Sequence, residues 1–169
     1  MAISNRDRVS KGLEMLAEGL GPFIDRAMST YIDGGDWISY LKNKDLTKFG
    51  NSKKLEITDV AVQLRAITEE RAAFKELLSQ PEAAFASELR EVRNRWSHNE
   101  AFSADDTYRA LDTMERLLTA VGASGPSEAV KKLRQDFQRT SLDADERRAA
   151  RSQTDQIQSF SVSGLKPWR

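Results

Sequence analysis

The chain has 169 residues, no cysteine and one histidine, and its 26 basic and 26 acidic residues give a formal net charge of zero. This composition argues against a disulfide scaffold and against a zinc site, which needs several Cys or His ligands. It also requires any contact with nucleic acid to use a local basic patch. No segment has the roughly 18 apolar residues of a membrane span, and the N-terminus lacks the apolar core of a signal peptide. We expect a cytoplasmic protein without a membrane contact.

Apolar residues recur at helical spacing along most of the chain, and no alternating strand pattern is convincing. Within the first helix, Gly19, Gly21 and Pro22 predict a kink or a short break. The turn at 33–36 precedes a short helix from Trp37 to Leu46, which Trp37 should anchor. The buried stripe of the first helix is predicted to be Val9, Leu13, Leu16, Leu20, Phe23 and Ala27.

A polar connection over 47–56 leads to a second long helix, which either Thr58 or Asp59 can cap. Arg71 occupies one position of its apolar stripe, and we expect this side chain to lie at the rim of the core with its charge in water. The stripe itself is predicted to be Val60, Leu64, Ile67, Phe74 and Leu78.

A third helix should start at Pro81, turn Trp96 into the core and fray near 97–99, and a fourth should run from Ser103 to Gly122. Helices of this kind pack as an antiparallel bundle. The sequence therefore predicts an all-α domain over 1–122. The region 123–169 contains one helix over about 128–139, and residues 140–163 are mostly charged and polar. We expect a helical linker or a partly ordered tail there, which would lead to a further domain outside this chain.

The chemistry of the chain concentrates in the segment 93–98, which ends on the only histidine, His98. No phosphate-binding loop, dinucleotide fingerprint or nucleophile elbow is present, so we expect no cofactor. Histidine is the side chain that exchanges protons near neutral pH, and arginine binds phosphate. Arg93 and His98 lie about 140° apart around a helix, whereas Asn94 and His98 share a face. A helix end or a second chain must therefore complete the site.

A site made of His98, Arg93 and Asn94 suits RNA cleavage without a metal, because the 2′-hydroxyl of RNA is itself the nucleophile. His98 would transfer the proton, Arg93 would stabilise the charge on the phosphorus, and Asn94 would orient the phosphate. The products would be a 2′,3′-cyclic phosphate and a 5′-hydroxyl. The neighbouring polar side chains are the candidate RNA contacts: Arg90, Arg95, Ser97 and Asn99.

A structural interpretation of the same residues is also open. A histidine at a helix end is often a C-terminal cap partner. Arginines on a helix are often a solvated face, and here Glu88 and Glu91 are possible partners. In that case the segment would stabilise the bundle and carry no chemistry.

The string Arg93-Asn94-x-x-x-His98, at the end of a bundle helix, resembles the Arg-x(4–6)-His signature of HEPN domains. With Gly19-Leu20-Gly21-Pro22-Phe23, it is similar to a subgroup named after a eukaryotic nuclease of messenger-RNA surveillance. The resemblance implies an all-α, often metal-independent endoribonuclease that dimerises to place two such motifs in one cleft. It also implies that Arg93 and His98 are the catalytic pair, with Asn94 as the polar residue that follows the arginine.

Bacterial members of this subgroup resemble large ATPases with an N-terminal HEPN domain, several of them associated with anti-phage defence. We therefore expect an endoribonuclease domain from a defence or toxin-like system, at the N-terminus of a longer protein. Some HEPN domains are not nucleases. The alternative is thus a dimerisation module that binds RNA or protein within a larger ATPase.

Overall fold

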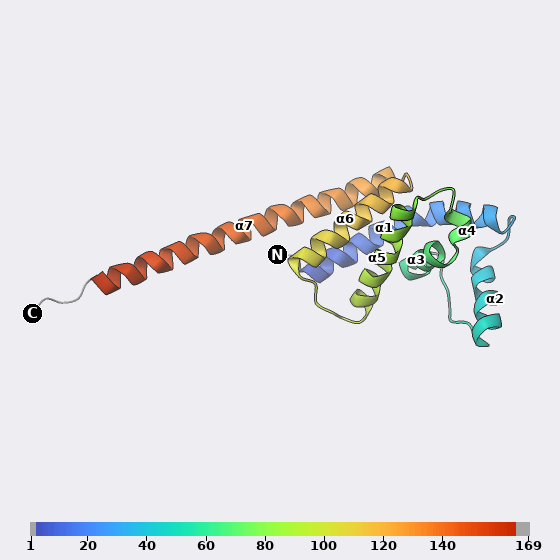
Figure 1. The fold of residues 1–169 in the computed structure, drawn as a ribbon, viewed down its shortest axis with the longest axis horizontal. Helices are drawn as coiled ribbons and strands as arrows, with labels where there is room; N and C mark the ends of the chain where they lie inside the picture. Colours follow the sequence, from blue (N-terminus) through green and yellow to red (C-terminus); the bar gives the residue numbers. More distant parts are fainter. Residues whose placement is uncertain (1–2, 165–169) are drawn as a thin grey trace, which may run out of the picture. The chain divides into compact units, whose positions relative to one another are not determined.

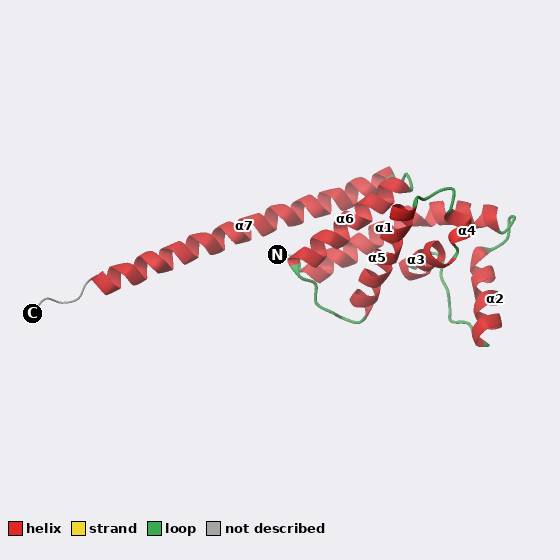
Figure 2. Cartoon of the chain, in the orientation of Figure 1, coloured by secondary structure: helices red, strands yellow, loops and turns green. Residues whose placement is uncertain are grey.

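The computed structural model describes residues 3–164, and within that range every regular element is a helix (Figures 1 and 2). The predicted all-α bundle is confirmed. None of the described helices is long and apolar enough to cross a membrane. The helices are α1 (Asn5–Tyr31), α2 (Trp37–Phe49), α3 (Val60–Glu69), α4 (Arg71–Phe74), α5 (Gln80–Ser97), α6 (Ala104–Ala120) and α7 (Ser124–Gly164).

The chain forms two compact units, Met1–Arg134 and Gln135–Arg169. In the first unit α1 packs against α3 and α6, and α5 packs against the same two helices. The core lies among these four helices and includes Leu16, Leu20, Leu64, Leu89, Leu111 and Leu117, all fully buried. The second unit contains most of α7, whose described side chains from 142 onward are exposed. The predicted helix over 128–139 is thus part of a longer one. The terminal residues 165–169 lie outside the described residues.

Of the kink or short break predicted within α1, the break is wrong, because the helix continues through Gly19, Gly21 and Pro22, and the kink stays a prediction. A Cβ at Gly19 would lie 2.3 Å from the Cδ2 atom of Leu118 in α6, so the glycine allows the two helices to approach closely. Pro22 is exposed and removes one hydrogen-bond donor. Leu20, between the two glycines, and Ile24, two residues after Pro22, are both fully buried, which favours the continuous helix.

The predicted second long helix is divided at Glu70, which leaves the helical region with φ −99° and ψ 53°. The carboxylate of Glu70 is 5% exposed and accepts hydrogen bonds from Lys44 and from Tyr40 of α2. A buried carboxylate needs such partners, and they lie far away in sequence. Asp59 is the cap of α3, since its side chain accepts from the amide of Ala61. Arg71 is exposed, as expected for a rim residue.

Trp37 anchors the start of α2 as predicted. Its side chain is 1% exposed, and its indole N–H donates to Asp25 of α1 at 3.2 Å. The helix extends beyond Leu46 to Phe49, where Gly50 adopts φ 74° and ends it. This end of α2 forms one wall of the pocket described below.

Candidate active site at the end of α5

The only histidine lies at the point where α5 ends. The backbone N–H of His98 donates to the carbonyl of Asn94 at 3.1 Å, and the next residue, Asn99, adopts φ 57°. The amide of Glu100 then donates to the carbonyl of Arg95 at 3.1 Å, which closes the helix. His98 therefore caps α5 through its backbone. Its imidazole is exposed and makes no hydrogen bond or ion pair within the described part of the chain.

Arg93 lies five residues before His98, so the two side chains are about 140° apart around the helix. It is half-buried and lines a pocket of about 270 Å³ together with Asn94. Within residues 3–159, no hydrogen bond or ion pair involves its guanidinium. The other residues that line this pocket are Lys53, Lys54, Leu55, Asp59, Ala61, Val62, Arg65 and Arg90.

One chain thus brings Arg93 and Asn94 to one pocket but does not bring His98 to it. This agrees with the separation of Arg93 and His98 expected from helical geometry. The side-chain amide of Asn94 makes no hydrogen bond among the described residues, so it is available to a ligand. The side chains of Arg93, Asn94 and His98, which have the chemistry for RNA cleavage, therefore make no hydrogen bond or ion pair among the described residues. Arg93 and Asn94 line the small pocket, and His98 does not.

Two of the predicted RNA contacts have local roles. The hydroxyl of Ser97 donates to the carbonyl of Asn94 at 2.8 Å, within the last turn of α5. Asn99 supplies the left-handed residue that follows the helix, a conformation that asparagine tolerates better than most residues. Both side chains are at the exposed end of α5.

Arg95 joins the end of α5 to the start of α6. Its guanidinium donates to Glu100 and Asp106, each at 3.1 Å, and to the carbonyl of Ala101 at 3.0 Å. It also lies over the ring of Phe102, 4.8 Å from the ring centre. The hydrogen bond from Arg95 holds the pKa of Asp106 below its usual value. This network gives Arg95 a structural role in positioning the loop after His98.

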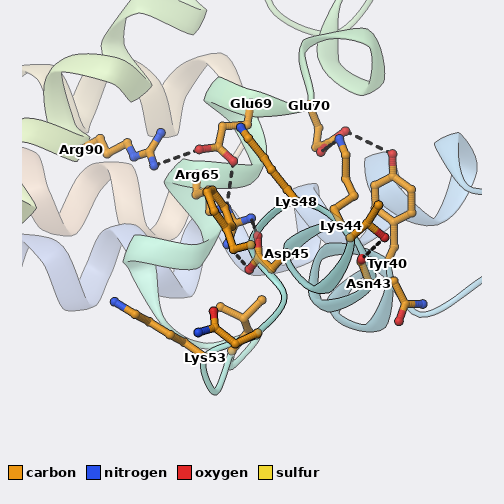
Figure 3. Close-up of a pocket in the computed structure, with 14 residues that line it drawn as sticks. Tyr40, Asn43, Lys44, Asp45, Lys48, Lys53, Arg65, Glu69, Glu70 and Arg90 are labelled. Carbon is orange, nitrogen blue, oxygen red and sulfur yellow. Dashed lines mark hydrogen bonds and ion pairs between the residues drawn. The ribbon is translucent and has the colours of Figure 1, made fainter.

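Arg90 is joined to α3 and lines both the small pocket and a larger one. It donates to the hydroxyl of Thr68 at 3.0 Å and to Glu69 at 3.1 Å. Arg65 lies between the carboxylates of Glu69 and Asp45, and its two terminal nitrogens bind the two oxygens of Asp45 at 3.0 and 2.6 Å (Figure 3). Hydrogen bonds from Arg65 lower the pKa of Asp45.

The structural interpretation named the wrong partners for these arginines. Glu88 accepts from Arg109 of α6 at 2.5 Å, and no described contact joins Glu91 to an arginine. Arg90 and Arg95 pair with carboxylates from other elements instead, because their long side chains reach across to the neighbouring helix and loop.

Trp96 lies at the edge of the core, half-buried beneath the guanidinium of Arg6, which is 5.2 Å from the ring centre. The sequence predicted that Trp96 lies in the core. The indole N–H and one terminal nitrogen of Arg6 are buried without a hydrogen-bond partner within the described residues.

The larger pocket, of about 1170 Å³, was missed by the sequence analysis. It lies between α2, the segment after it and α3, and includes Tyr40, Lys44, Lys48, Phe49 and Lys53 (Figure 3). The available signal was the density of lysines over 42–54, which we interpreted only as a short helix and a polar connection. Within residues 3–164, no group of three or more His, Cys, Asp or Glu side chains could hold a metal ion.

Comparison with known proteins supports one assignment. Residues 11–122 match the family model described as Swt1-like HEPN, which covers about two thirds of the chain and includes α5 and His98. Comparisons with curated proteins and with solved structures find no match. HEPN domains are generally of the ribonuclease type. The chain belongs to the Swt1-like HEPN family.

Proposed function

We propose that this domain is a metal-independent endoribonuclease that acts as a homodimer. One observation carries the proposal: the imidazole of His98 and the guanidinium of Arg93 have no protein partner among the described residues. These two residues form the motif of a family of the ribonuclease type. A buried or exposed ion pair would have explained these side chains structurally. Both are instead available to a substrate.

The roles follow from the chemistry of each side chain. His98 takes the proton of the 2′-hydroxyl, the 2′-oxygen bonds to phosphorus, and the bond from phosphorus to the 5′-oxygen breaks. Water gives a proton to the departing 5′-oxygen, and His98 returns its own proton to the solvent. Arg93 stabilises the charge on the phosphoryl oxygens, and Asn94 orients the phosphate. RNA yields a 2′,3′-cyclic phosphate and a 5′-hydroxyl, and DNA is not cleaved.

The geometry of α5 supports the proposed dimerisation. Within one chain Arg93 lines the small pocket, and His98 does not line it. A second copy related by a two-fold axis would place its own His98 opposite this pocket. The active site would then combine groups from two chains.

The test is cleavage of RNA in the presence of EDTA by the purified protein and its variants. We expect His98→Ala and Arg93→Ala to abolish cleavage while their circular dichroism spectra remain those of the wild type. Arg71→Ala is the matched control, because Arg71 is an exposed arginine that lines neither pocket. Cleavage by His98→Ala at the wild-type rate would contradict the proposal.

We further propose that the domain over 1–122 serves an anti-phage or toxin-like system. The exposed part of α7 would connect it to an ATPase domain or partner. Expression of the wild type should then stop the growth of a bacterial host, and His98→Ala should not. The non-catalytic alternative, a dimerisation module of a larger ATPase, is favoured if the protein dimerises in sedimentation and cleaves no RNA.

A further inference from the structure

The small pocket at Arg93 continues into the larger pocket beside α2. The two share lining residues Lys53, Leu55, Arg65 and Arg90, so they adjoin along the segment after α2. Lys53 links them, since it lies with Arg93 in one pocket and with Phe49 in the other. We call this continuous surface, from Arg93 past Lys53 to Phe49, the α2–α5 groove.

The cations of the α2–α5 groove fall into two groups. In the first group, carboxylates of Asp45, Glu56, Glu69 and Glu70 form ion pairs with Arg65, Arg90, Lys44 and Lys54. Lys48, Lys53 and Arg93 have no ion pair within residues 3–159, and in Figure 3 no dashed line reaches Lys53 or Lys48. The cations without an ion pair therefore follow the length of the groove, although the charge of Lys48 also interacts with Asp45. Such a line of charge suits the backbone of a nucleic acid.

The end of α2 adds an aromatic surface to this charge. Phe49 is 65% exposed, the largest exposure among the described large apolar side chains of α1 to α6. The ammonium of Lys48 lies 5.2 Å from the centre of its ring. Exposing much of a phenyl ring to water is unfavourable in free energy. Gly50 ends the helix directly after this residue. A flat apolar ring beside cations that form no ion pair is an arrangement that can stack an unpaired base.

We propose that the α2–α5 groove binds a nucleotide of single-stranded RNA next to the cleaved one, with its base stacked on Phe49 and its phosphate held by Lys53. The proposal rests on the proposed function, since it states how the substrate of that site is held. The small pocket, at about 270 Å³, is below the usual size of a ligand pocket and suits a phosphate group. Arg93 lies at that end, so the groove leads from the stacked base to the phosphate that is cleaved.

A single strand is the form that fits, because a base within a duplex has both faces covered. Stacking and phosphate contacts do not require the 2′-hydroxyl. The groove should therefore bind a single-stranded deoxyoligonucleotide, which lacks the nucleophile and cannot be cleaved. Binding can thus be measured without catalysis.

The experiment measures fluorescence anisotropy of a labelled single-stranded deoxyoligonucleotide with the full chain. We expect Phe49→Leu, which keeps an apolar side chain but removes the ring, to raise Kd about tenfold. Phe49→Trp should restore binding. Lys53→Ala should raise Kd about fivefold and reduce the slope of log Kd against log salt by about 0.7, the value for one contact with a single strand. Leu77→Ala and Lys75→Ala are the controls, since both residues are exposed and line neither pocket of the groove.

The two proposals fail in different ways. If Phe49→Leu and Lys53→Ala bind like the wild type, or if the wild type does not bind the single strand, the groove assignment is overturned even where RNA is cleaved. If binding depends on these two residues and no RNA is cleaved in EDTA, the groove assignment stands and the nuclease is rejected. With RNA as substrate, Phe49→Leu should raise KM and leave kcat unchanged, because stacking on a base away from the reacting phosphorus is the same before and in the transition state.

Discussion

The backbone amide of His98 donates to the carbonyl of Asn94 at 3.1 Å, so the residue ends α5 without using its imidazole. Any residue except proline can supply that amide. The choice of histidine at this position is therefore unexplained by the helix end itself. This separation of backbone and side-chain roles makes the function of the imidazole testable.

Replacing His98 with alanine should leave stability almost unchanged while cleavage is lost. The ring is exposed and has no partner among the described residues, and substitutions of that kind change the free energy of unfolding by about 0.5 kcal/mol or less. Urea denaturation of wild type and His98→Ala measures this. A markedly lower midpoint for the variant would show that the imidazole stabilises the fold.

Asn99 should tolerate glycine and reject a branched residue. Its φ of 57° is left-handed, a conformation that costs residues with a Cβ about 1–2 kcal/mol. We expect Asn99→Gly to keep both stability and RNA affinity, and Asn99→Val to lower the thermal midpoint. If Asn99→Gly were stable but bound RNA weakly, the side chain would be an RNA contact, as the sequence suggested.

Mixing two inactive variants should restore activity if the site is shared between chains. A mixed dimer of His98→Ala and Arg93→Ala protein has one site with both wild-type residues and one with neither. After unfolding and refolding together, about a quarter of the wild-type rate is expected, since half of the dimers are mixed and one of their two sites is intact. An equal mixture that remains inactive would place His98 and Arg93 of each site in the same chain.

Gly19 and Gly21 should respond in opposite ways to alanine. A Cβ at Gly19 meets Leu118 at 2.3 Å and Ala123 at 3.0 Å, so overpacking should cost about 1–3 kcal/mol. At Gly21 the nearest atom is 3.5 Å away, an ordinary contact, and the better helix propensity of alanine should stabilise α1 by about 0.5–1 kcal/mol. Thermal unfolding of the two variants measures the difference. Equal effects would contradict the close packing of α1 on α6.

Acid should weaken the pairing of α2 with α3. Hydrogen bonds from Arg65 hold the pKa of Asp45 below its ordinary value of 3.8. A carboxyl whose pKa is lowered by folding stabilises the protein above its unfolded-state pKa, and this stabilisation is lost as the pH falls through the folded-state pKa. The unfolding free energy should therefore decline as the pH drops below about 4.

The substitution Asp45→Asn measures how much the charged Asp45 carboxylate contributes to the unfolding free energy. At neutral pH the variant should be less stable by about 1.5–3 kcal/mol, because Arg65 loses a charged hydrogen-bond partner. The difference from wild type should shrink in acid. Asp143→Asn, an exposed carboxyl of α7, controls for the change in charge. A constant difference at all pH values would mean that the Asp45 charge does not contribute.

Several features followed from the sequence because they depend on residues close together in the chain. Apolar spacing predicted the helices, and Trp37 was predicted as the anchor of α2. Ser103 was predicted as a cap, and of the two candidates Thr58 and Asp59 the structure uses Asp59. The position of His98 at a helix end was predicted in the same way. Periodicity and capping are local, so the sequence determines them directly.

Other features were decided by contacts between distant residues. Gly19 looked like a break because its packing partner Leu118 is nearly a hundred positions away. Glu70 ends α3 where its side chain meets Lys44 of α2, a contact that no spacing rule contains. The α2–α5 groove exists because the segment after α2 lies beside α5. The sequence thus indicated the candidate side chains for action on RNA, and helical spacing alone separated Arg93 from His98. Tertiary packing decided that Arg93 shares a pocket with Lys53 and Arg65, because only folding brings distant segments into contact.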